Sequence, residues 1–254
     1  MRALLLELAE AVQRAVDAFR GDIGETVGKG ADGAPTARID AVAERAVLET
    51  LERSRVEVNV LSEEAGWIDR GAVTTLVVDP IDGTHNAIRG VPAYATSIAL
   101  ARSSLRDVEA GVVRNLVTGH TYFAERAKGA TLDGRPIRVR SFDPSDMLFD
   151  VYFGENANPK AAEVAAAARR VRTFGAASLD LCLVAQGAAD LYYMNSAAPT
   201  RLRVVDIAAG AFIVREAGGE VFDLDGNLLD LPLDPNARTN LVAVGDRRAL
   251  ESIR

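Results

Sequence analysis

The period of the hydrophobic residues changes along this chain, and the change limits the folds that the chain can adopt. Apolar residues recur every three to four positions over residues 1–20 and again from Pro35–Thr36 to about Ser54, which predicts two helices with one apolar face each. Between them, the polar, glycine-rich segment 21–35 lacks periodicity, which predicts a mobile loop. From Val56 onward the period falls to two, which predicts short strands. Because few residues connect these strands, we expect antiparallel pairing.

The second half of the chain alternates between strand-like and helix-like segments. Strands are predicted at 147–154, 171–175, 189–194, 220–224 and 240–245, and helices at 159–170, 178–187 and 204–218. This order predicts an α+β fold with two sheets and with helices between and outside them. We expect a single domain over 1–254, with an N-terminal half of about 1–145 and a C-terminal half of about 146–254 that do not fold apart.

Composition excludes several classes of protein. The 254 residues are 48% hydrophobic and 26% charged, which is typical of globular proteins and not of disordered or fibrous ones. No apolar run reaches the roughly 18 residues that a membrane-spanning helix needs, so we expect no membrane partner. The formal net charge of −7 argues against a nucleic-acid partner. The single cysteine, Cys182, cannot build a disulfide framework, which favours a cytoplasmic protein.

The residue types that bind metals point to a hard cation. The chain has two histidines and one cysteine, too few for a zinc site of the usual nitrogen and sulfur type. It has 36 aspartate and glutamate residues, whose oxygen atoms suit magnesium or manganese. We therefore expect a metal site in this chain to be made of carboxylates.

The sequence DPIDGTHN, Asp79–Asn86, follows directly on a strand that is apolar enough to be buried. The turn lets Asp79 and Asp82 converge on one point, together with the Ile81 carbonyl. The backbone N–H groups of Gly83–Thr84 then suit a phosphate oxygen beside a cation. Aspartate, proline and glycine are also common turn residues, so this segment on its own is more typical of an ordinary turn.

Three more segments carry carboxylates at the ends of predicted elements. Glu63 and Glu64 follow a β-rich run, Asp206 lies in the first turn of the long apolar helix, and Asp40 lies beside the apolar stripe of the second helix. Taken singly, these are a solvated loop, a helix cap and a surface carboxylate. Taken together with the aspartate pair, and without soft ligands, they match a site for phosphoryl transfer with several magnesium ions.

At these residues the chain resembles the inositol monophosphatase superfamily of magnesium-dependent, lithium-sensitive phosphatases. Two ordered signatures carry the resemblance, Asp79–Asn86 and Val205–Gly210, the second continuing to Glu216–Gly219. Further family elements follow in the expected order at Thr36–Asp40, Ser62–Glu64, Ala127–Ala130 and Gly175–Ser178. The resemblance covers essentially the whole chain, and it implies a layered αβαβα sandwich.

The resemblance also implies a role for each motif residue. It implies two to three Mg²⁺ ions, for which Mn²⁺ can substitute, and a third, weaker ion would lean on Glu63 beside the loop with Lys29 and Asp32. The implied metal ligands are Glu63, Asp79, the carbonyl of Ile81, Asp82 and Asp206, with Asp79 bridging two ions. Asp40 and Thr84, with Glu63, are implied as the catalytic residues that orient and deprotonate the attacking water.

The substrate implied by the resemblance is a small sugar or polyol phosphate. The context of Leu202–Ala209 looks most like the archaeal and thermophilic branch, which acts on both fructose 1,6-bisphosphate and inositol 1-phosphate. The implied substrate-binding residues are Asp82, Gly83, Thr84, Arg172, Gly175, Ala177 and Arg201. The second arginine of that branch is not cleanly placed here, and either Arg201 or Arg203 substitutes for it, unless both belong to a solvated basic loop.

Two other functions compete with this hypothesis. One is a phosphatase for 3′-phosphoadenosine 5′-phosphate from the same superfamily, which would need a surface for the adenine base. The other is a non-catalytic regulatory or scaffold protein that keeps the fold. The complete set of expected ligands and water-activating residues favours an enzyme over a scaffold. By resemblance we expect a homodimer, or a tetramer, in the cytoplasm.

Overall fold

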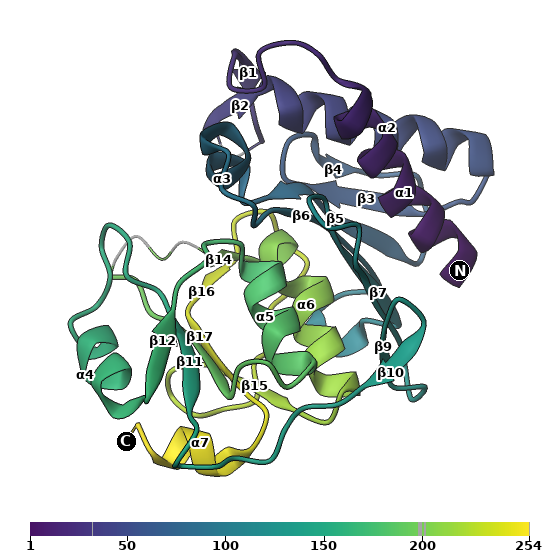
Figure 1. The fold of residues 1–254 in the computed structure, drawn as a ribbon. Coiled ribbons are helices and arrows are strands. Elements are labelled where there is room, and N and C mark those ends of the chain that lie inside the picture. The colour runs from purple at the N-terminus through teal and green to yellow at the C-terminus, as the bar shows by residue number, and fades with distance from the viewer. Residues whose placement is uncertain (32, 198–199, 201, 254) are drawn as a thin grey trace.

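Two long helices, α1 (Arg2–Ala18) and α2 (Arg38–Ser54), lie side by side across the outer face of the larger β-sheet (Figure 1). Each turns an apolar face inward, and Leu8 and Val47 are among the residues buried there. Both predicted helices are therefore present. The structure is a computed structural model, and it describes residues 1–31, 33–197, 200 and 202–253.

Among the described residues, eight strands form the larger sheet in the order β10-β9-β8-β7-β6-β5-β3-β4. They are β3 (Asn59–Ser62), β4 (Gly66–Ile68), β5 (Thr75–Asp82), β6 (Ala95–Ala101), β7 (Ala110–Asn115), β8 (Thr121–Glu125), β9 (Ala130–Leu132) and β10 (Arg135–Ile137). Neighbouring strands are antiparallel as predicted, except that β3 and β5 are parallel. The exception arises because β4 turns back along one side of β3, and β5 then adds on the other side.

The strand that carries the first acidic motif, β5, is buried along its whole length. Its register with β6 shifts between Asp79 and Asp82, an irregularity of the kind that re-aims side chains at the end of a strand. Pro80 lies in this stretch and has no N–H to donate to the sheet. Gly83 follows with φ of 88°, and a Cβ there would lie 3.0 Å from a backbone carbonyl oxygen. The turn into helix α3 (Thr84–Arg89) therefore requires glycine.

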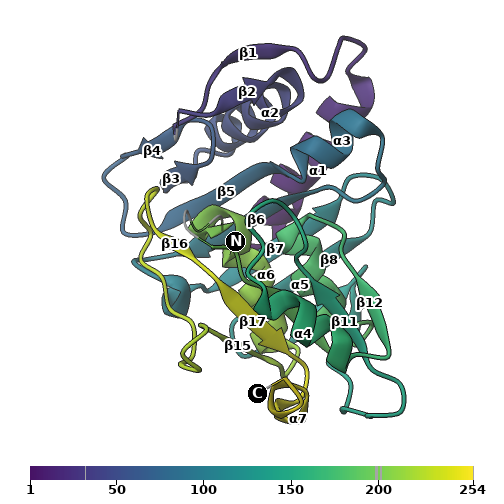
Figure 2. The same cartoon turned by 90° about the vertical axis from the view of Figure 1, so that its left-hand side faces the viewer.

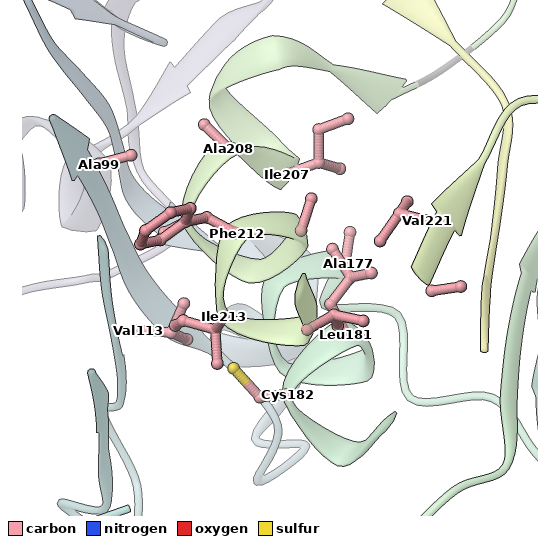
Figure 3. Close-up of a cluster of buried hydrophobic side chains, with 14 of the residues drawn as sticks. Ala99, Val113, Ala177, Leu181, Cys182, Ile207, Ala208, Phe212, Ile213 and Val221 are labelled. Atoms are coloured by element: carbon pink, nitrogen blue, oxygen red, sulfur yellow. The ribbon is translucent and has the colours of Figure 1, made fainter. Parts of the chain in front are cut away.

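The middle layer consists of α5 (Ala177–Ala185) and α6 (Val204–Glu216), which pack against each other between the two larger sheets. In Figure 3, Phe212 and Ile213 of α6 lie near Val113 of the larger sheet, while Val221 of the smaller sheet lies across the helix from them. The small residues at the start of α6 have a structural cause. A Cβ on Gly111 would lie 3.2 Å from the Ala209 Cα, and a Cβ on Gly210 would lie 2.8 Å from the Leu181 Cδ1.

Among the residues that the structure describes, five strands form the smaller sheet in the order β12-β11-β13-β17-β15. They are β11 (Leu148–Val151), β12 (Arg170–Arg172), β13 (Leu191–Met194), β15 (Glu220–Phe222) and β17 (Leu241–Val244). Helices α4 (Lys160–Ala167) and α7 (Arg247–Glu251) cover its outer face. The layers thus run helix, sheet, helix, sheet, helix, which confirms the predicted α+β fold and its αβαβα sandwich.

The glycine-rich segment 21–35 differs from the prediction. It contains strand β1 (Thr26–Lys29), which pairs with β2 (Pro35–Ala37) as a hairpin beside α2 (Figure 2). The second helix therefore begins at Arg38 rather than at Pro35–Thr36. The sequence did not indicate the hairpin because β1 is exposed at every residue and so has no alternation of apolar and polar side chains.

The remaining elements are short. Strand β14 (Leu202–Arg203) pairs with β16 (Arg238–Thr239) and leads directly into α6, and a 3₁₀ helix covers Leu105–Asp107. None of the described helices combines the length and apolar character that a membrane crossing needs.

Candidate active site

Three of the predicted metal ligands converge at the junction of the larger sheet and the middle layer. Glu63 follows β3, Asp79 lies near the end of β5, and Asp206 lies in the first turn of α6. Each offers a carboxylate oxygen, and these three oxygens all lie within 4.8 Å of one another. The structure therefore brings together segments that are more than 120 residues apart in the chain.

The electrostatics of this cluster favour a bound cation. Asp79 is 1% exposed, and its Oδ1 has no hydrogen-bond partner among the described residues. Burial, followed by the charges of Glu63, Asp82 and Asp206, raises the pKa of Asp79 well above its ordinary value. A divalent cation would satisfy that oxygen and offset the repulsion. All the side-chain donors are carboxylate oxygens, so the cluster fits a hard metal ion.

Asp82 and Ile81 lie beside the cluster, and their oxygens, unlike Asp79 Oδ1, accept hydrogen bonds from the protein. Both oxygens of Asp82 accept hydrogen bonds from the start of α5, from Ser178 N at 2.7 Å, Ser178 Oγ at 2.5 Å and Ala177 N at 3.2 Å. Burial, partly offset by Ser178 and reinforced by Asp206, raises the pKa of Asp82 to about 7. The Ile81 carbonyl accepts a hydrogen bond from Thr84 Oγ1 at 2.9 Å. Asp82 therefore ties the acidic cluster to the middle layer.

Asp40 and Thr84 form a hydrogen-bonded pair next to the cluster. Thr84 Oγ1 lies 2.8 Å from Asp40 Oδ1, and Asp40 Oδ2 accepts a hydrogen bond from Ala37 N at 3.3 Å. A hydroxyl has one proton, so Thr84 can donate to Asp40 when that carboxylate is ionised and can accept from it when it is protonated. Burial is the main reason that the pKa of Asp40 rises to about 7, although Thr84 acts in the opposite direction. The pair can therefore pass a proton in either direction.

Arg203 lies among the same carboxylates, which the sequence did not predict. Its Nη2 donates to Glu63 Oε1 at 2.5 Å and to Asp206 Oδ1 at 2.8 Å, and its side chain is 16% exposed. Burial opposes the charge, but Asp206 and Glu63 outweigh it and raise the pKa of the guanidinium. Arg203 stands three residues before Asp206, one helical turn away, and this spacing was the available signal.

Two further contacts, also missed by the sequence, fix the end of β3 and the loop after it to β2 and α2. Thr36 Oγ1 donates to Glu64 Oε2, and Ser62 Oγ donates to Glu44 Oε1. The same Glu44 oxygen accepts a hydrogen bond from Ala65 N at 3.0 Å. The backbone around Glu63 is therefore held from both sides.

Only some of the predicted substrate-binding residues lie near the acidic cluster. Asn86 Nδ2 donates to the Phe174 carbonyl at 2.7 Å, which holds Gly175 beside α3. Ala177 contacts Asp82 through its backbone N–H. Arg172 is exposed on edge strand β12, and its Nη1 donates to the neighbouring Val171 carbonyl rather than to the acidic cluster. Arg201 and Asp32 lie outside the described residues.

Comparisons with known proteins agree with this fold and site. The model of the inositol monophosphatase family matches residues 2–253. A relative from Methanothermobacter thermautotrophicus, named fructose-1,6-bisphosphatase/inositol-1-monophosphatase, is 36% identical and covers 99% of this chain and 94% of its own. A crystal structure of an inositol monophosphatase–fructose 1,6-bisphosphatase has a TM-score of 0.87 at 29% identity, over 99% of this chain and 97% of that one.

The fold and the acidic site together define a metal-dependent phosphatase for small phosphate substrates. The chain belongs to the inositol monophosphatase family. Some relatives carry a different name: a Methanococcus maripaludis protein named bifunctional NADP phosphatase/NAD kinase is 34% identical over 95% of this chain, which spans 46% of that relative.

Proposed function

We propose that this phosphatase hydrolyses sugar and polyol phosphates, fructose 1,6-bisphosphate and inositol 1-phosphate, with Mg²⁺ as its metal. The observation that carries the proposal is the convergence of Glu63, Asp79 and Asp206 beside the Asp40–Thr84 pair. The substrate class is supported by the name of the relative that is 36% identical over nearly the whole chain.

In this proposal Glu63, Asp79, Asp82, Asp206 and the Ile81 carbonyl hold two to three Mg²⁺ ions, and Mn²⁺ can replace them. When bound, the ions offset the negative charge of the phosphate and lower the pKa of water. Among the described residues, Asp79 Oδ1 has no partner and the cluster holds no soft donor, which supports a hard, oxygen-binding ion.

The chain's own residues then orient and deprotonate the attacking water. Thr84 accepts a hydrogen bond from the water and passes a proton to Asp40, to which its hydroxyl is already hydrogen-bonded. Glu63 helps to orient the water at the cluster. The Ala37 N–H on Asp40 Oδ2 keeps the carboxylate turned toward Thr84.

The proposed substrate pocket lies beside α3 and the start of α5. The N–H groups of Gly83 and Thr84 hold the phosphate, and Asp82 is the substrate-binding residue beside them. The sugar or polyol is bound by Arg172, Gly175, Ala177 and Arg201. We also propose that the enzyme works in the cytoplasm as a homodimer or a tetramer, which sedimentation analysis would test.

A second candidate function is the hydrolysis of a dinucleotide or nucleotide phosphate. This candidate is supported by the name of the relative called NADP phosphatase/NAD kinase. Phosphate release should be measured side by side on fructose 1,6-bisphosphate, inositol 1-phosphate, NADP and 3′-phosphoadenosine 5′-phosphate, each with Mg²⁺ and with EDTA. Comparable, Mg²⁺-dependent kcat/KM on the first two supports the proposal. A strong preference for NADP or the nucleotide replaces it, and inactivity on all four favours the scaffold hypothesis.

A further inference from the structure

Arg203 uses the carboxylate oxygens that a metal ion would need. Its Nη2 donates to Glu63 Oε1 and Asp206 Oδ1, and its Nε lies 3.1 Å from the same Asp206 oxygen. The other Asp206 oxygen, Oδ2, accepts the Arg203 backbone N–H at 2.7 Å. Both oxygens of Asp206 therefore already accept hydrogen bonds from one residue.

The position of Arg203 is set by the fold rather than by a flexible loop. Arg203 ends strand β14, which pairs with β16, and it caps the N-terminus of α6. Its backbone cannot withdraw without breaking the strand or the start of the helix. The side chain, in contrast, can rotate away from the cluster about its own torsions.

A guanidinium and a divalent cation both need these oxygens at short distance, and both carry positive charge. When they share a cluster of three carboxylates, each weakens the binding of the other. Arginine keeps its proton at every ordinary pH, so it can yield the site only by moving.

We infer that Arg203 is a built-in competitor for the metal site: its guanidinium must leave Glu63 and Asp206 before a cation takes both carboxylates. The inference rests on the proposed metal site. It assigns Arg203 a positioning role that sets the metal concentration at which the enzyme becomes active. The guanidinium also offsets the carboxylate charges when metal is scarce, and so keeps the fold stable under those conditions.

The test is a direct measurement of Mg²⁺ binding by titration calorimetry on full-length protein dialysed against EDTA and then against buffer. Methionine in Arg203→Met keeps an unbranched stem, which is shorter than that of arginine, and removes the charge. We expect this variant to bind Mg²⁺ at least about tenfold more tightly than the wild type, the scale of one charge-assisted hydrogen bond. Arg203→Lys, which keeps the charge but cannot bridge two carboxylates in the same way, should give a smaller gain.

Thermal unfolding supplies a second readout. In EDTA the Tm of Arg203→Met should fall below that of the wild type, and saturating Mg²⁺ should remove or reverse the difference. The matched control is Arg215→Met on the same helix, because Arg215 donates to the carbonyls of Leu105 and Leu229 and not to the cluster. Its Mg²⁺ affinity should stay at the wild-type value.

Three results would overturn the inference. Mg²⁺ binding by Arg203→Met that is unchanged or weaker would mean that Arg203 supports the site instead of competing for it. If Arg203→Met fails to fold, Arg203→Lys takes its place in the test. An Mg²⁺ affinity of Arg203→Lys that is equal to or lower than that of the wild type would then contradict the inference. A wild type that binds no Mg²⁺ would remove the metal site and the inference with it, whereas tight Mg²⁺ binding without phosphatase activity would contradict the proposed function alone.

Discussion

Two groups of buried or partly buried carboxylates in this molecule differ in what offsets their charge. The first is the acidic cluster of Glu63, Asp79 and Asp206, which Arg203 contacts. The second is the pair Asp150 and Asp180, on β11 and α5, which are 1% and 2% exposed, and the charge of Asp150 adds to burial in raising the pKa of Asp180. No cation contacts the second pair among the described residues.

Two carboxylates can share a hydrogen bond only if one of them carries a proton. Burial raises the pKa of Asp150 to about 7, and burial together with the charge of Asp150 raises that of Asp180 further. Each residue still has one oxygen without a partner among the described residues. The comparison points to two ways to bury acidic groups: at the site Arg203 offsets the charge, and in the pair the raised pKa values favour the neutral, protonated form.

The largest effect is expected from Asp79→Asn in the acidic cluster. This substitution removes the most buried ligand charge, so turnover should fall by about 10³-fold or more, the several kcal/mol that a metal supplies to the transition state. The Tm in EDTA should rise, because the repulsion from Glu63 and Asp206 is removed. Phosphate release and thermal unfolding measure the two effects. Activity within a few-fold of the wild type would refute the metal assignment.

The second prediction concerns the proton in the Asp150–Asp180 pair. In the unfolded chain Asp150 loses its proton near its ordinary pKa of 3.8, but in the folded protein it keeps the proton to about pH 7. The contribution of Asp150 to the free energy of unfolding should therefore fall as pH rises from about 4 to about 7, by up to about 4 kcal/mol. Asp150→Asn removes this contribution, so its free energy of unfolding should fall less over this range than that of the wild type. Asp40, Asp82 and Asp180 keep their own contributions in the variant.

Urea unfolding at pH 4.5 and pH 8, in EDTA, measures this difference between wild type and Asp150→Asn. Tyr192 on β13 and Arg172 on β12 lie in register with Asp150, so both proteins keep the same titratable and charged neighbours. Asp225→Asn, at an exposed turn, is the control and should leave the pH dependence unchanged. An Asp150→Asn protein with the wild-type pH dependence would show that the pair holds no extra proton.

The acidic site was predictable because its residues follow hydrophobic signals. Asp79 lies near the end of a buried strand, and Asp206 lies in the first turn of an apolar helix, so the ends of two buried elements present carboxylates. Glu63 was predicted on the same grounds and lies within the cluster. Which atoms bind a metal stays a prediction.

The Asp150–Asp180 pair and the position of Arg203 were not predicted, for a different reason. Both depend on how separate layers of the fold pack together. The periodicity of hydrophobic residues predicts single helices and strands, and not how they pack. The available signal was a lone aspartate within an apolar segment, as in LFDV around Asp150 and SLDLCL around Asp180. Such a residue is buried with its segment and must find a proton or a partner.

The third prediction concerns proton transfer from the attacking water. This step is proposed for the active site and not for the Asp150–Asp180 pair. Thr84→Ala removes the hydroxyl between Asp40 and the water, so kcat should fall by about 10²-fold with KM nearly unchanged. Thr84→Ser restores a hydroxyl and should recover most of the loss. A change confined to KM would assign Thr84 to substrate binding instead.

The smallest effect is expected where charges meet at the surface. Arg247 forms two hydrogen bonds of 2.6 Å with Glu220, as short as those of Arg203, but its side chain is 65% exposed. Water screens such a pair, so Arg247→Gln should leave the urea midpoint of unfolding and the Mg²⁺ affinity close to their wild-type values. Urea unfolding and calorimetry check both values. Because the two arginines make similar contacts, a large effect at Arg247 would mean that geometry, not burial, gives Arg203 its importance.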